Sequence, residues 1–222
     1  MKKHITPRDN FAYLTIALLA FLLLSAALHQ FLGGAIGGRL IEALTVLTLV
    51  GGVWSVKEVR AYFRIGIALT VGIAIVSATG VLLDHSGLTI FHLLILLCFF
   101  CLTTWAALKQ VFLSGRVDGN AIVGAICVYL LLGLIWAVLF MLLEQMLPGS
   151  FNGLDTDDPG GHLDALTYFS FVSLTTMGFG DITPALPLAR YFTYLEGVVG
   201  EFYVATLVAS LVGVRVSAWQ QK

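Results

Sequence analysis

The chain has 222 residues, of which 59% are hydrophobic and 11% are charged, and its mean hydropathy is +0.95. A soluble globular domain is about 45–50% apolar and about 25% charged. Because so few charged side chains cannot cover a water-soluble fold, the composition excludes a soluble enzyme and a disordered tail and predicts a membrane protein. The formal net charge of -1 also gives no reason to expect nucleic acid as a partner.

Six stretches of the chain are candidates for membrane-spanning helices, each of which needs about 20 mostly apolar residues. Four of them carry no charged residue: Phe11–Gly38, Ile65–Leu83, His85–Leu108 and Gly119–Leu143. The other two are Leu40–Val56, which is shorter and contains Glu42, and Leu188–Val214, which contains Arg190, Glu196 and Glu201. The sequence therefore predicts the fold class of an all-α membrane protein with six transmembrane helices.

The lysines and arginines predict the orientation of these helices. With a cytoplasmic N-terminus, only Arg39 and Arg190 fall outside, and the positive-inside rule then favours this topology strongly. The basic residues on the cytoplasmic side are Lys2, Lys3, Arg8, Lys57, Arg60, Arg64, Lys109, Arg116, Arg215 and Lys222. We therefore expect a multi-pass protein of the cell membrane with both termini in the cytoplasm. Met1–Leu28 begins like a signal peptide, but its apolar run exceeds the usual length and we expect it to be retained.

Two patterns within the spans have ordinary explanations. The fourth span, His85–Leu108, lacks the arginine at every third position that an arginine-based voltage sensor needs, so we expect none. Cys98 and Cys101 have the spacing of a metal or redox pair, but zinc would need two further ligands nearby. We expect these two cysteines and Cys127 to be small hydrophobes buried in the spans.

The composition changes after Leu147, where a polar loop begins. A short apolar stretch, Leu163–Leu174, follows this loop and leads directly into the sequence TTMGFGD at Thr175–Asp181. Asp164 near its start suits a helix N-terminus, where a carboxylate opposes the helix dipole. A helix this short cannot span a membrane, and lipid cannot satisfy the extended, glycine-containing backbone after it. That backbone must line a water- or ion-filled path or be buried in protein.

The segment Asp164–Pro184, DALTYFSFVSLTTMGFGDITP, resembles the pore helix and selectivity filter of potassium channels. The filter of that family reads TVGYG, and Thr176–Gly180 here reads TMGFG. The later sequence Leu195–Tyr203 resembles the inner helix of bacterial two-helix pore modules, so the resemblance covers about Ala121–Arg215.

The resemblance implies how an ion would be bound. The K⁺ ligands would be the backbone carbonyls of Thr176, Met177, Gly178 and Phe179, with the Thr176 hydroxyl at the inner end and Gly180 completing the filter. Four copies close a ring of carbonyls, so the implied assembly is a homotetramer. The implied partners are K⁺ as the permeant ion and membrane lipid, with no cofactor and no enzymatic activity.

The resemblance also divides the chain into two parts. Residues 1–118 would form a four-span bundle that carries no motif of known role. Residues 119–222 would form the pore domain. Its parts are the outer helix Gly119–Leu147, the pore helix Leu163–Leu174, the filter and the inner helix Leu188–Val214.

Two filter residues depart from the family pattern, and a non-selective monovalent cation channel is therefore an alternative function. Met177 replaces valine without changing a backbone ligand, whereas Phe179 lacks the hydroxyl that tyrosine would offer. Position 169 is also phenylalanine, so neither of these two side chains has a polar group to form the missing hydrogen bond. The resemblance assigns filter support to Thr175, Asp181 and Tyr168, with a hydrogen bond between the last two.

The inner helix contains candidates for the pore cavity or for gating, namely Glu201, Gly197 and Gly200. Carboxylates within a span are costly and often functional. Glu196 and Glu201 could instead bond to the pore helix or a neighbouring subunit, and the glycines could simply allow close helix packing.

A remote alternative comes from another class of protein, because a glycine, any residue, glycine and aspartate at positions 178–181 is also the motif of intramembrane aspartyl proteases. Such an enzyme needs a second aspartate within a span. Asp9, Asp84 and Asp118 lie at span ends or in loops.

Overall fold

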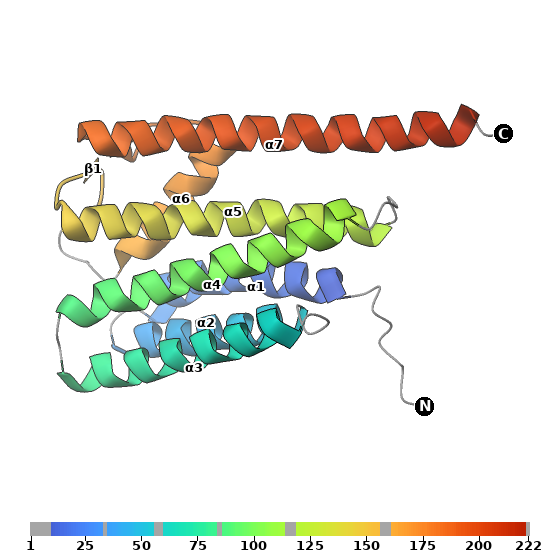
Figure 1. The fold of residues 1–222 in the computed structure, drawn as a ribbon. Helices are drawn as coiled ribbons and strands as arrows, with labels where there is room; N and C mark the ends of the chain where they lie inside the picture. Colours follow the sequence, from blue (N-terminus) through green and yellow to red (C-terminus); the bar gives the residue numbers. More distant parts are fainter. Residues whose placement is uncertain are drawn as a thin grey trace.

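The computed structural model describes residues 10–32, 35–55, 60–83, 86–113, 119–155 and 161–220. The described residues form seven helices and two very short strands (Figure 1). In chain order these are α1 Asn10–Leu32, α2 Ala35–Ser55, α3 Arg60–Leu83, α4 Ser86–Leu113, α5 Gly119–Met146, β1 Phe151–Asn152, α6 His162–Leu174, β2 Thr183–Pro184 and α7 Pro187–Gln220. The predicted all-α membrane fold is confirmed.

Among the described residues, four helical segments are long and apolar enough to cross a membrane: Phe11–Leu32, Leu88–Val111, Asn120–Met146 and Pro187–Ser210. α2 and α3 contribute shorter apolar segments, Ala43–Trp54 and Tyr62–Ser77, so a count of six spans stays a prediction. Several basic residues behind the predicted orientation lie outside the described residues, among them Lys2, Lys3, Arg8, Lys57, Arg116 and Lys222.

The first predicted span is too long. α1 ends at Leu32 and α2 begins at Ala35, so residues 35–38 belong to the second helix and not to the first. No charged residue interrupts the apolar run Phe11–Gly38, and composition alone therefore could not locate the end of the helix within it.

The six long helices lie side by side, with α7 at one edge and α2 and α3 at the other (Figure 1). The short α6 is inclined and packs against both α5 and α7. α5 is apolar on all sides and packs against α1, α4 and α6, as expected for a helix buried in the protein.

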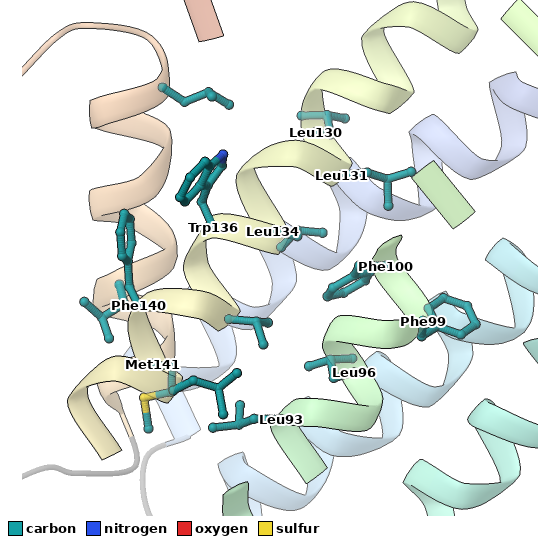
Figure 2. Close-up of a cluster of buried hydrophobic side chains, with 14 of the residues drawn as sticks. Leu93, Leu96, Phe99, Phe100, Leu130, Leu131, Leu134, Trp136, Phe140 and Met141 are labelled. Carbon is teal, nitrogen blue, oxygen red and sulfur yellow. The ribbon is translucent and has the colours of Figure 1, made fainter. Parts of the chain in front are cut away.

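The hydrophobic core continues across the predicted boundary between residues 118 and 119. Leu93, Leu96 and Phe100 of α4 face Leu134 and Met141 of α5 (Figure 2). The opposite side of α5 carries Trp136 and Phe140, which belong to the same cluster. The four-helix bundle and the pore segment thus share one core, although their division into two domains stays a prediction.

The expectation of buried cysteines holds only for Cys127. Cys98 and Cys101 are exposed on the surface of α4. Their spacing of three residues places them on one face of the helix, and this face lies away from the buried Leu96, Phe99 and Phe100.

Candidate functional site: the segment from α6 to α7

α6 is held against α5 by aromatic packing at its middle. Its buried residues are Leu166, Phe169, Ser170, Val172 and Leu174. The Phe169 ring lies 5.3 Å from that of Phe140 and 5.4 Å from that of Phe151, and the last two rings are 5.3 Å apart. Each such aromatic pair stabilises the fold by about 0.5–1.5 kcal/mol, in addition to the free energy gained by burying its apolar surface.

A polar contact joins α6 to both neighbouring helices at the same level. The Ser170 hydroxyl oxygen lies 2.7 Å from the Gly133 carbonyl of α5 and 2.5 Å from the Glu196 carboxyl oxygen Oε1 of α7. The Glu196 side chain is fully buried, and its other oxygen, Oε2, has no hydrogen-bond partner among the residues that the structure describes. Of the two roles considered for Glu196, the structure shows the bond to the pore helix.

The C-terminal end of α6 lies directly on α7. The hydroxyl of Tyr129 donates a hydrogen bond of 3.2 Å to the carbonyl of Leu174, the last residue of α6. A Cβ added at Gly200 would overlap that same carbonyl oxygen and lie 2.9 Å from Leu174 Cδ1. A Cβ at Gly197 would meet only the Ser173 carbonyl at 3.9 Å, which is an ordinary contact. Gly200 therefore has a packing role, whereas Gly197 has none of that kind.

The filter segment folds back onto the end of α6 through its amide groups. The amides of Thr175, Thr176 and Met177 donate to the carbonyls of Phe171, Ser173 and Val172 at 2.9–3.0 Å. The Thr175 hydroxyl donates to Phe171 as well, at 2.6 Å. These bonds use the terminal helix carbonyls that would otherwise lack partners.

The backbone angle φ is positive at every second filter residue: 59° at Thr176, 56° at Gly178 and 81° at Gly180. Glycine adopts such angles without steric cost, but threonine does so rarely. In a uniform strand, successive peptide groups point to opposite sides. Alternating left- and right-handed residues instead allow like groups to point to one side, as in backbone anion-binding nests. Here the alternation allows a row of carbonyls.

In the part of the chain that the structure describes, no hydrogen bond is donated to the carbonyl oxygens of residues 176–180. These oxygens follow the C-terminus of α6, where the helix dipole carries partial negative charge and favours a cation. The arrangement can therefore bind a cation through backbone oxygens.

A small two-stranded sheet fixes the other end of the filter segment. β1 pairs with β2 in antiparallel orientation, with Phe151 opposite Pro184 and Asn152 opposite Thr183. Glu144, at the end of α5, accepts hydrogen bonds from the amides of Gly149 at 2.7 Å and Phe151 at 3.1 Å. The turn before the pore helix is thereby tied to the chain that leaves the filter.

We expect Gly153→Ala to weaken this bracing. A Cβ there would overlap the carbonyl oxygen of Asp181, at a φ of 87° that alanine also disfavours. Gly149→Ala is the matched control, because Gly149 has a similar φ of 83° but no described atom within 4 Å of an added Cβ. Gly153→Ala should destabilise the folded protein by about 1–3 kcal/mol more than Gly149→Ala, as measured by thermal unfolding in detergent. Equal losses would show that the Asp181 contact contributes nothing.

The carboxyl group of Asp181 lies just after the filter and is bonded to the pore helix. The Tyr168 hydroxyl donates to it, and this hydrogen bond is the largest cause that lowers the pKa of Asp181 from its ordinary value of 3.8. The backbone amides of Asp181 and Ile182 lower that pKa further. The charged form of Asp181 is thus favoured in the folded protein.

Tyr168→Phe removes the main cause of that shift, so the pKa of Asp181 should rise towards 3.8. The pKa of Asp181 is lower in the folded than in the unfolded protein, so its charged carboxylate stabilises the fold. This stabilisation is fully present above the unfolded-state pKa and is lost as the pH falls through the folded-state pKa. The variant should therefore lose stability at a higher pH than the unmodified protein, in unfolding measured from about pH 5 to pH 2. Tyr191→Phe, at an exposed tyrosine of α7, is the control, and identical acid profiles for the two variants would contradict the assignment.

Two further predicted residues lie on the exposed surface of the pore segment. Glu201 is exposed on α7, and Phe179 is 67% exposed. Phe169 packs instead against Phe140 and Phe151, as described above. The chain thus brings Thr175, Tyr168 and Asp181 to the filter segment.

Sequence reasoning missed three supporting residues: Gly133, Glu144 and Gly153. An added Cβ at Gly133 would lie 2.6 Å from the ring of Phe171 in α6. The only signal in the sequence is that each residue is a glycine or a carboxylate, and this is too weak to identify a contact.

The fold and this segment together define a membrane protein in which a re-entrant helix and loop lie between two long helices. Residues 125–216 match a family model described as an ion channel. The match starts within α5, ends within α7 and contains the whole filter segment, and this similarity supports an ion channel function. No curated protein and no solved structure matches the chain.

Proposed function

We propose that four copies of this chain form a potassium-selective channel that conducts K⁺ passively down its electrochemical gradient. The observation that carries the proposal is the backbone of residues 176–180, whose conformation allows a row of carbonyls. These oxygens accept no hydrogen bond among the described residues, and φ is positive at every second position of the row. Backbone carbonyls that replace the hydration shell of the ion are the basis of K⁺ selectivity.

In this proposal the K⁺ ligands are the carbonyls of Thr176, Met177, Gly178 and Phe179, and the Thr176 hydroxyl lies at the inner end. Thr175 and the Tyr168–Asp181 pair support the filter from the pore helix. The negative end of the α6 dipole offsets part of the cost of dehydrating the cation.

The tetramer is supported by the large apolar side chains that a single chain leaves exposed. Met177 and Phe179, on either side of Gly178, are 63% and 67% exposed. Tyr194, Phe202 and other large apolar side chains of α7 are exposed as well. Three further copies would cover these side chains and complete the ring of carbonyls.

The remaining features follow from the same proposal. Residues 1–118 form a peripheral bundle around the pore domain of residues 119–222, the protein lies in the cell membrane, and both termini are cytoplasmic. Glu201 and the glycines at positions 197 and 200 belong to the cavity wall or the gating region, with Gly200 also required for packing.

The reversal potential of the purified protein in planar bilayers tests the function. A reversal near the K⁺ equilibrium potential, first in a K⁺ gradient and then in K⁺ against Na⁺, is the expected result. A reversal near zero in K⁺ against Na⁺ would favour the non-selective cation channel. Met177→Val and Phe179→Tyr would then show which departure from the family pattern is responsible. If no current is seen, Ba²⁺-sensitive K⁺ flux from liposomes distinguishes a closed channel from a wrong assignment.

A further inference from the structure

A cavity of about 680 Å³ lies between the first four helices and the pore helix. α1 to α6 all contribute to its lining, and α7 does not. Its volume is within the range of about 300–1,000 Å³ that is usual for small-molecule sites. The cavity reaches the first two turns of α6 through Leu163, Asp164 and Thr167, so a bound molecule would touch the helix that carries the filter.

One part of the lining is apolar. Leu93, Leu96 and Phe100 come from α4, and Leu134 and Val138 come from α5. All but Val138 are labelled in Figure 2, where the α4 side chains face α5. This part of the lining offers a hydrocarbon or aromatic group a surface away from polar atoms.

The polar part of the lining presents acceptors at α1, α2 and α6, whereas Gln145 of α5 and His92 of α4 also carry donors. The hydroxyls of Ser25, Thr45 and Thr167 each donate to a carbonyl of their own helix, at 3.2, 2.8 and 2.7 Å. Because a hydroxyl has one hydrogen and two lone pairs, these groups have only acceptors left to offer. Asp164 adds a carboxylate, and His29 is its partner across the gap from α1, at 4.0 Å.

We propose that this cavity binds a small amphipathic cation, with an ammonium head at Asp164 and Thr167 and an apolar body between α4 and α5. An ammonium group carries hydrogen-bond donors and positive charge but no acceptor, which complements the acceptors at the α6 end. This ligand site is separate from the proposed ion path and does not depend on K⁺ selectivity.

The test uses three matched compounds that share a phenyl ring and four methylenes and differ only in the head group: 4-phenylbutylammonium, 4-phenylbutanol and 5-phenylpentanoate. A diazirine derivative of the ammonium compound labels the purified full-length protein in nanodiscs, and mass spectrometry locates the labelled peptides. We expect labels in α4, α5 and α6, with protection by the ammonium compound at a concentration at least about tenfold lower than by the alcohol. The carboxylate should protect least.

Three variants connect this result to the cavity. Asp164→Asn should remove most of the difference between the ammonium compound and the alcohol. Thr89→Trp, which fills the cavity from an exposed position of its lining, should weaken protection by both compounds. Asp155→Asn, at an exposed acid that does not line the cavity, is the control and should change neither. If Asp164→Asn does not fold, Thr167→Val removes an acceptor at the same end with little change in volume.

Equal protection by the alcohol and the ammonium compound would overturn the proposal and identify an apolar site for lipid chains. Labels confined to α7 would overturn it as well. Since labelling requires no current, failure here and failure of the proposed channel function are observed separately.

Discussion

Replacing Gly200 with alanine is expected to displace the pore helix and abolish channel activity. The added Cβ would overlap the Leu174 carbonyl, which is the last of α6 and lies next to the filter. Backbone cannot move aside as a flexible side chain does, so α6 and α7 must separate. Overpacking of this kind costs about 1–3 kcal/mol, and a shift of less than an ångström at the base of the filter would disturb ligand geometry.

Gly197→Ala is the matched control on the same helix. Its Cβ would make an ordinary contact of 3.9 Å, and alanine is a better helix former than glycine by about 0.5–1 kcal/mol. The two substitutions should therefore change the stability of the protein in opposite directions. Thermal unfolding in detergent and K⁺ flux from liposomes measure both effects. A Gly200→Ala protein as stable as Gly197→Ala would show that α6 does not depend on this contact.

The second large loss of stability is expected from substitutions at the buried contact between Ser170 and Glu196. The Ser170 hydroxyl has one hydrogen but two acceptors within reach, the Gly133 carbonyl at 2.7 Å and the Glu196 carboxyl at 2.5 Å. A carbonyl cannot donate, so both contacts are hydrogen bonds only if a neutral Glu196 donates to Ser170 and Ser170 donates to Gly133. A neutral carboxyl also avoids the cost of a buried, unpaired charge on the side of Oε2.

Glu196→Gln should consequently be tolerated, because its amide donates to Ser170 as the neutral carboxyl does. Ser170→Ala should destabilise the protein by about 1–3 kcal/mol, because it leaves two buried groups without their partner. Ser173→Ala, for which no side-chain hydrogen bond is found among the described residues, is the control. Thermal unfolding measures all three, and a loss from Glu196→Gln as large as that from Ser170→Ala would indicate a charged Glu196.

The elements that the sequence could predict are those specified by a local pattern. Apolar runs mark the long helices, and a stretch too short to span identified α6 to within one residue of its start, at His162 instead of Leu163. The two filter glycines are required by their own backbone angles, which is a local property as well. Each of these features can be recognised without knowing what it contacts.

The rest depends on contacts between residues far apart in the chain. Gly153 and Asp181 meet only because β1 pairs with β2, and Gly133 is opposite Phe171 only because α6 lies across α5. The cavity beside α6 is likewise formed by six helices together. A single sequence contains no periodicity that would report such pairs, so these residues had to be found in the structure.

The pairing of β1 with β2 makes the pore helix and filter a unit that begins and ends at the same place. Phe151 and Pro184 are partners in the ladder, and Cα atoms so paired are only about 4.5–5.5 Å apart. A chimera can therefore receive residues 151–184 in place of the equivalent segment of a related chain. Because the two ends of this segment lie close together, it constrains little how far apart the two flanking long helices of that chain must be. A shorter exchange that starts at the pore helix would separate β2 from β1 and Asp181 from Gly153, so the exchangeable cassette is larger than the recognisable motif.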